Sequence, residues 1–135
     1  MSYFDCFLAP VPRANRAAYE RLARISAEVV KEHGALNVVE CWLDESGPEA
    51  QSYHGAETKG AEVAYGNFAT AAGALQGETV VFSCVEWPDK AARDAGMEKV
   101  TNDPRMQFGD QPAAFDGSRL IAAGFKPMPL GASDT

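Results

Sequence analysis

The chain has 135 residues, of which 46% are hydrophobic and 23% are charged, and its formal net charge is −7. This is the length and composition of one globular domain. The acidic balance argues against a nucleic-acid partner, because the charges of a polyanion would repel it. RNA binding would need a basic face, and the twelve Lys and Arg residues are scattered along the sequence instead.

No apolar run reaches the roughly 18 residues that a membrane span requires, so no membrane partner is expected. The N-terminus lacks a basic segment ahead of an apolar one, which argues against a signal peptide. We therefore expect a cytoplasmic location.

Cys6, Cys41 and Cys84 match no CxxC or zinc spacing, and their odd number argues against a disulfide framework. Each lies among apolar neighbours in a predicted strand, which favours buried, reduced cysteine. His33 and His54 lie far apart without a ligand pattern around them, so the sequence predicts no metal site. No nucleotide-binding glycine pattern occurs, and we expect no cofactor.

Alternation and turn residues predict a first strand over 3–11, which prolines end. Helical spacing predicts a helix over 15–33, with Asn15 as N-cap and Gly34 as the residue that ends it. The next strand, over 36–44, is largely apolar on both faces, which indicates that both faces are covered.

The glycine-rich stretch that follows contains a predicted loop excursion over 48–66 and a short helix capped by Asn67. A strand over 79–87 then leads directly into a helix that Pro88 and Asp89 open and that ends near residue 101. A turn over 103–106, a strand over 119–125 and a flexible tail over 127–135 complete the chain, so 1–126 is predicted to form a single domain.

The order β-α-β-insert-β-α-β predicts an α+β, ferredoxin-like fold, in which two helices cover one face of an antiparallel sheet. The other face would remain bare and apolar. A second copy packed sheet to sheet would cover it, so we expect a homodimer.

Several short segments together resemble the YbaA-like family of bacterial proteins, domain of unknown function 1428. They are Tyr3-Phe4-Asp5-Cys6-Phe7, Gly34-Ala35, Glu40-Cys41-Trp42, Val80-Val81-Phe82-Ser83, Pro88, Lys90, Arg93-Asp94-Ala95, Asp103-Pro104-Arg105-Met106, Phe115-Asp116-Gly117, Arg119 and Gly124-Phe125. The resemblance implies a dimeric α/β-barrel, a superfamily that includes cofactor-free monooxygenases of aromatic compounds, haem-degrading enzymes and proteins without known activity. The chain departs from the family pattern at Cys6, usually Gly, at Cys84, often Trp, and in its longer excursion.

Three carboxylates, Asp5, Glu40 and Glu86, lie within or near the end of apolar strands. Burying an unpaired carboxylate is costly or raises its pKa, and such a group can serve as a general acid or base. Glu40 is the first catalytic candidate, because Trp42 shares its strand face and could stack on an aromatic ligand. The alternative is that arginines pair with these carboxylates and only hold the structure together.

The sequence thus carries two main function hypotheses. One is a small-molecule-binding protein or monooxygenase-like enzyme with a small aromatic ligand; the other is a non-catalytic structural or regulatory homodimer. The candidate ligand-binding residues are Tyr3, Trp42, Ser83, Arg93 and Arg105. The monooxygenase version rests on analogy of fold.

Overall fold

The computed structural model describes residues 1–53, 65–109 and 111–131. Its strands are β1 (Tyr3–Pro12), β2 (Asn37–Trp42), β3 (Glu78–Trp87) and β4 (Ile121–Phe125). Its α-helices are α1 (Arg16–Glu32), α2 (Phe68–Ala72) and α3 (Lys90–Thr101). Single 3-10 turns occur at Arg13–Asn15, Ala50–Tyr53, Pro104–Met106 and Gly117–Arg119.

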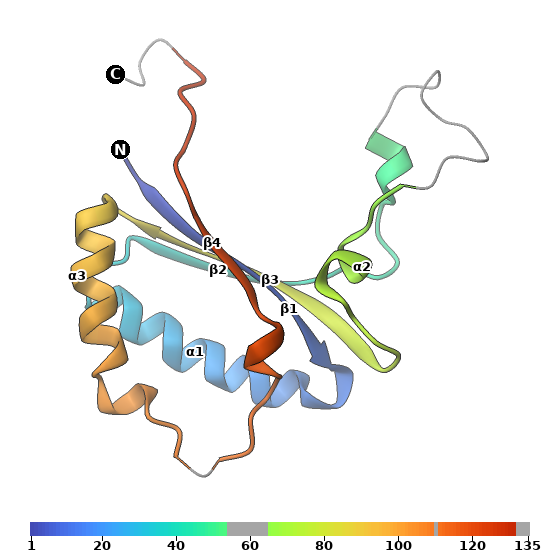
Figure 1. Cartoon of the computed structure of the whole chain (residues 1–135), viewed down its shortest axis with the longest axis horizontal. Helices are drawn as coiled ribbons and strands as arrows, with labels where there is room; N and C mark the ends of the chain where they lie inside the picture. Colours follow the sequence, from blue (N-terminus) through green and yellow to red (C-terminus); the bar gives the residue numbers. More distant parts are fainter. Residues whose placement is uncertain (54–64, 110, 132–135) are drawn as a thin grey trace.

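The four strands form one antiparallel sheet in the order β2-β3-β1-β4. Helices α1 and α3 lie on one side of this sheet (Figure 1). The predicted α+β, ferredoxin-like fold is therefore confirmed.

The longest pairing, between β1 and β3, fixes which side chains face the helices. It runs over ten residue pairs, from Tyr3 opposite Trp87 to Pro12 opposite Glu78. Successive side chains of a strand point to opposite faces. The odd-numbered residues of both strands consequently face the helices, and among them Ala9, Val11 and Trp87 are almost completely buried.

Helix α1 begins and ends close to the predicted positions, but Asn15 does not cap it through its side chain. Its Nδ2 donates instead to the carbonyl oxygen of Ala114 (3.0 Å), which ties the helix start to the loop before β4. Gly34 follows the helix with a φ of 115°, a left-handed conformation that glycine adopts without steric cost.

Helix α3 is held to the sheet by a buried polar junction. Asp89 caps the helix by accepting a hydrogen bond from the backbone N–H of Ala92 (2.7 Å). Asp5 in β1 accepts hydrogen bonds from Trp87 Nε1 (3.1 Å) and from Arg93 Nε (3.0 Å to its nearer oxygen). The pairing of Asp5 with Arg93 thus joins the first strand to the last long helix.

The second face of the sheet carries apolar side chains from all four strands. Short helix α2 covers only one end of this bare face (Figure 1), where Pro10 and Val80 are buried. Elsewhere Val39 is 43% exposed, and Phe82, Ile121 and Phe125 are 41%, 49% and 53% exposed.

The prediction of buried cysteines is wrong. Cys6 and Cys84 are half-buried and Cys41 is exposed, and all three are free thiols. Their even positions in β1 and β3, and the position of Cys41 opposite Phe82, place them on the bare face. The predicted alternation agrees with the structure, but the residues that the structure describes leave most of that face uncovered.

The predicted excursion over 48–66 contains the 3-10 turn at Ala50–Tyr53, and its residues 54–64, including His54, lie outside the described residues. Residues 126–131 follow β4 without a helix or strand. Among the helices of the described segments, none is both long and apolar enough to cross a membrane.

We predict that Gly96→Ala lowers the free energy of unfolding by about 2 kcal/mol, a cost typical of overpacking. An added Cβ would lie 2.4 Å from Trp87 Cζ3 and 2.6 Å from the carbonyl oxygen of His33. The Trp87 ring is completely buried and the second neighbour is a backbone atom, so neither can move away easily. Urea denaturation measures the change. Gly117→Ala is the control, because no atom lies within 4 Å of its added Cβ; an equal loss in both variants would contradict the packing argument.

Candidate functional site

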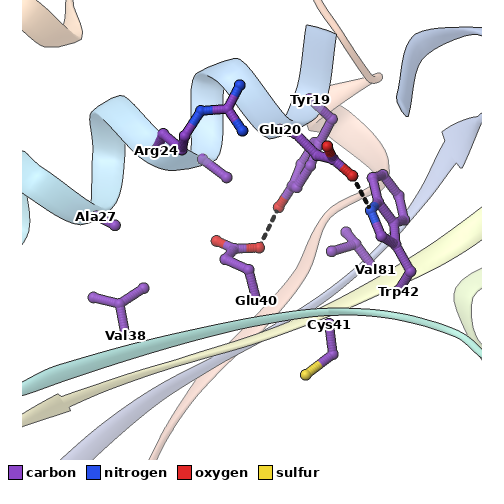
Figure 2. Close-up of a pocket in the computed structure, with 10 residues that line it drawn as sticks. Tyr19, Glu20, Arg24, Ala27, Val38, Glu40, Cys41, Trp42 and Val81 are labelled. Carbon is purple, nitrogen blue, oxygen red and sulfur yellow. Dashed lines mark hydrogen bonds between the residues drawn. The ribbon is translucent and has the colours of Figure 1, made fainter. Parts of the chain in front are cut away.

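A cavity of about 340 Å³ lies between helix α1 and the edge strand β2. Figure 2 shows side chains of both elements pointing into it, while Cys41 points to the opposite side of β2. The lining residues are Tyr19, Glu20, Ala23, Arg24, Ala27, Val38, Glu40, Cys41, Trp42 and Val81. The cavity therefore has apolar walls with a few polar groups from α1 and β2.

Glu40 is the carboxylate at the centre of this cavity. Its Oε1 accepts hydrogen bonds from Tyr19 Oη (2.9 Å) and from Ser83 Oγ (2.8 Å). Ser83 lies directly opposite Glu40 in the neighbouring strand, and Tyr19 reaches down from α1 (Figure 2). Two hydroxyl groups thus fix the orientation of one carboxylate oxygen.

The other oxygen of Glu40, Oε2, has no hydrogen bond to any residue within 1–53, 65–109 or 111–131. In Figure 2 it points along the cavity toward Ala27. Glu40 is itself an exposed residue, whereas both of its partners are buried, with Tyr19 8% and Ser83 3% exposed. The protein therefore fixes Oε1 of the carboxylate, while Oε2 faces the cavity.

The Tyr19 hydroxyl acts here as a donor that keeps its proton. Burial raises the pKa of this phenol well above its usual range, and the charge of Glu40 raises it further. Because the neutral phenol persists at physiological pH, Tyr19 supplies a hydrogen bond rather than a charge.

Trp42 forms one end of the cavity, and three residues from the first half of α1 hold it in place. Its Nε1 donates to Glu20 Oε2 (2.8 Å), as Figure 2 shows. The Arg16 guanidinium carbon lies 4.8 Å from the centre of its ring system, and the Tyr19 ring meets it edge-on at 5.3 Å. Part of the Trp42 surface is therefore already occupied by protein groups.

Strand alternation predicted Glu40 and Trp42 on one face, and the structure brings both to this cavity, where Ser83 bonds to Glu40 from the neighbouring strand. Tyr19 was not among the predicted site residues, although it lies on the apolar face of the predicted helix. A tyrosine hydroxyl on such a face is the signal, since a buried O–H usually has a hydrogen-bond partner.

Asp5, Arg93 and Tyr3 lie away from this cavity. Asp5 is buried and paired with Arg93, as described above. The Tyr3 ring packs over Gly124 of β4, where an added Cβ would lie 1.9 Å from the Tyr3 hydroxyl oxygen. The pair of Asp5 and Arg93 thus joins β1 to α3, and the packing of Tyr3 on Gly124 joins β1 to β4.

Glu86 and Arg105 also lie outside the cavity. Glu86 is on the opposite face of the sheet from Glu40, where it accepts a hydrogen bond from Ser2 Oγ (2.6 Å). Arg105 donates to Asp103 (2.7 Å) and to Glu32 (2.5 Å). The three candidate carboxylates thus occupy three separate environments.

His33 contacts Asp103, with 3.0 Å between Nε2 and Oδ2. Hydrogen bonds from Arg105, first, and from His33 hold the pKa of Asp103 well below its usual range. This network joins the end of α1 to the turn after α3. Across the described part of the chain, no three His, Cys, Asp or Glu side chains are placed to hold a metal ion.

We predict that Glu40→Ala destabilises the protein by about 1–3 kcal/mol, because the buried Ser83 hydroxyl loses its acceptor. Adding Ser83→Ala should recover part of this loss, since the orphaned hydroxyl is then gone. A double-mutant cycle from urea denaturation measures the coupling. Strictly additive losses would show that the bond between Ser83 and Glu40 contributes nothing to stability.

Comparison with known sequences identifies relatives across nearly the whole chain. The model of a family described as a protein of unknown function, DUF1428, matches residues 2–117. An uncharacterized protein YbaA of Escherichia coli K12 is 36% identical over 128 residues, which cover 95% of this chain and 97% of the relative. The YbaA proteins of E. coli O157:H7 and Shigella flexneri match equally well. The chain therefore belongs to the DUF1428 family, as its sequence segments predicted.

Proposed function

We propose that this protein binds a small organic molecule in the cavity between α1 and β2, with Glu40 as its polar anchor. The observation that carries the proposal is the geometry of Glu40, whose one oxygen is fixed by two buried hydroxyls while the other faces the cavity. A volume of about 340 Å³ lies within the range of small-molecule sites.

The charges around the cavity indicate which ligands fit. Glu20 and Glu40 contribute two carboxylates, against the single guanidinium of Arg24. Ala23, Ala27 and Val38 offer apolar surface. The ligand should therefore have an apolar body and a hydrogen-bond donor, an ammonium group being the strongest partner for Oε2.

An aromatic body, which the sequence analysis favoured, would contact the part of Trp42 that Arg16 and Tyr19 leave free. We place this binding protein in the cytoplasm, where glutathione and thioredoxin keep free thiols such as its three cysteines reduced as long as no oxidant acts on them. The expectation of a cationic ligand is based on the carboxylates of Glu20 and Glu40. The expectation of an aromatic ring in that ligand is based on Trp42 alone.

The matched pair phenethylamine and phenylacetate tests the proposal, because the two share a ring and differ in the sign of their charge. We predict that isothermal titration calorimetry detects phenethylamine and not phenylacetate. Glu40→Gln should weaken phenethylamine binding about tenfold or more, because the amide still accepts from Tyr19 and Ser83 but loses its charge.

Glu28→Gln is the matched control, since Glu28 is an exposed residue of the same helix that does not line the cavity. Equal binding of both compounds, or equal weakening in both variants, would overturn Glu40 as the anchor. Native mass spectrometry of the purified protein then searches for a bound molecule that leaves on denaturation.

The same geometry fits proton abstraction by Glu40 Oε2, which the monooxygenase-like version would need. In that reaction the substrate supplies the electrons, one oxygen atom of O₂ enters the product and the other leaves as water. A co-purified ligand is therefore incubated with the protein in air. A ligand recovered unchanged supports binding alone, and one that gains oxygen supports an enzyme.

The bare sheet face favours a second proposal, which is compatible with the first: the protein works as a homodimer packed sheet to sheet. Apolar side chains from all four strands are exposed there, including Phe82, Ile121 and Phe125. A second copy offers the same apolar surface, so a two-fold arrangement is self-complementary.

We predict that Phe125→Glu converts a dimer into a monomer, measured by light scattering after size-exclusion chromatography. The introduced carboxylate would have to be buried without a partner at the interface, which costs several kcal/mol. Tyr53→Glu, at a residue 74% exposed outside the sheet, is the control. A monomeric wild-type protein would contradict the homodimer directly.

A further inference from the structure

Cys6 and Cys84 form a pair of thiols in the middle of the bare face. They lie directly opposite each other in the antiparallel strands β1 and β3, and their sulfur atoms are 3.6 Å apart. Opposite residues in such strands have Cα atoms about 4.5–5.5 Å apart. This lies within the roughly 4.4–6.8 Å that a disulfide spans, so a bond needs rotation of the side chains and no movement of the strands.

The pair is distinct from the third thiol of the face. Cys41 lies opposite Phe82, and Val39 is the β2 residue opposite Cys84. Cys6 and Cys84 are half-buried, whereas Cys41 is exposed. Only Cys6 and Cys84 are therefore direct cross-strand neighbours, and Cys41 can be replaced without removing a member of the pair.

We propose that Cys6 and Cys84 form a reversible disulfide between β1 and β3, with a low-molecular-weight disulfide such as glutathione disulfide as the oxidant. One thiolate attacks the oxidant and forms a mixed disulfide, releasing one glutathione. The second thiol of the pair then attacks the mixed disulfide and releases the second glutathione. The protein loses two electrons and two protons, and the oxidant is reduced to two thiols.

The second step is favoured by the placement of the sulfurs. A neighbouring thiol 3.6 Å away reacts intramolecularly, with an effective concentration far above that of glutathione in solution. The mixed disulfide should consequently be short-lived when both cysteines are present. It should persist when either one is removed.

Burial raises the pKa of Cys84 to about 11, and the hydrogen bond with Cys6 and the nearby carboxylates of Glu86 and Asp5 add to the effect. Since the thiolate is the attacking species, attack by Cys84 should be slow at neutral pH and accelerate as the pH rises toward 11. The other titratable groups on this face include Cys41, Glu78, which pairs with Arg119, and Asp44, which lines one groove with Cys41 and Phe82.

The test uses the full chain with Cys41→Ser, treated with glutathione disulfide and analysed by intact mass spectrometry. We expect a product lighter by two hydrogen atoms, without a glutathionyl group, that dithiothreitol reverses. Adding Cys6→Ser or Cys84→Ser should instead leave a stable glutathionyl adduct on the remaining cysteine. The oxidised form should also melt at a higher temperature, because the bond closes a long loop between positions 6 and 84.

The same reaction is run on protein that also carries Phe125→Glu, so that burial of the face in a dimer does not hide the thiols. Two unreacted thiols, or persistent glutathionyl adducts on Cys6 and Cys84 together, in this background would overturn the proposal. The outcome is independent of phenethylamine binding, which concerns the other face of the sheet.

Discussion

The contact between the indole of Trp87 and Gly96 fixes how closely α3 approaches the sheet. No side chain fits at position 96, and the same indole donates to Asp5, which in turn pairs with Arg93. Helix α3 is therefore anchored at the end of β3, and α1 is left to cover β2. The α1 residues over that part of β2 include Ala23 and Ala27, whose side chains are too short to fill the gap. The cavity beside Glu40 follows from this arrangement.

Local patterns predicted most of the fold and half of the candidate site. Alternation along β2 placed Glu40 and Trp42 on one face, and the cap at Asp89 marked the start of α3. Ser83 was a candidate ligand-binding residue, but its hydrogen bond to Glu40 and that of Tyr19 were not predictable in the same way. Ser83 reaches it through the register of two strands, and Tyr19 through the packing of a helix on the sheet. Both depend on contacts between distant parts of the sequence, which local periodicity does not determine.

The three carboxylates look alike in the sequence because each lies within or at the end of an apolar strand. Their differences come from partners far away in the chain, since Asp5 meets a guanidinium 88 residues away and Glu40 meets two neutral hydroxyls. A carboxylate paired with a guanidinium already has a cationic partner, whereas one held by neutral donors leaves room for a cationic ligand. The same holds for the cysteines, because strand alternation places all three on one face, whereas the packing against that face depends on distant parts of the structure.

Strand β2 contributes side chains to both faces of the sheet. Glu40 and Trp42 point to the cavity, and Val39 and Cys41, between and beside them, point to the bare face. Among the described strands, β2 lies at the edge of the sheet and pairs with β3 alone, so it can shift at less cost than the central strands. Any displacement moves side chains on both faces together, since they share one backbone. Under the ligand and homodimer proposals, a ligand that favours one position of β2 would therefore alter the affinity of the bare face for a second copy. By linkage, dimerisation would alter the affinity for the ligand by the same factor.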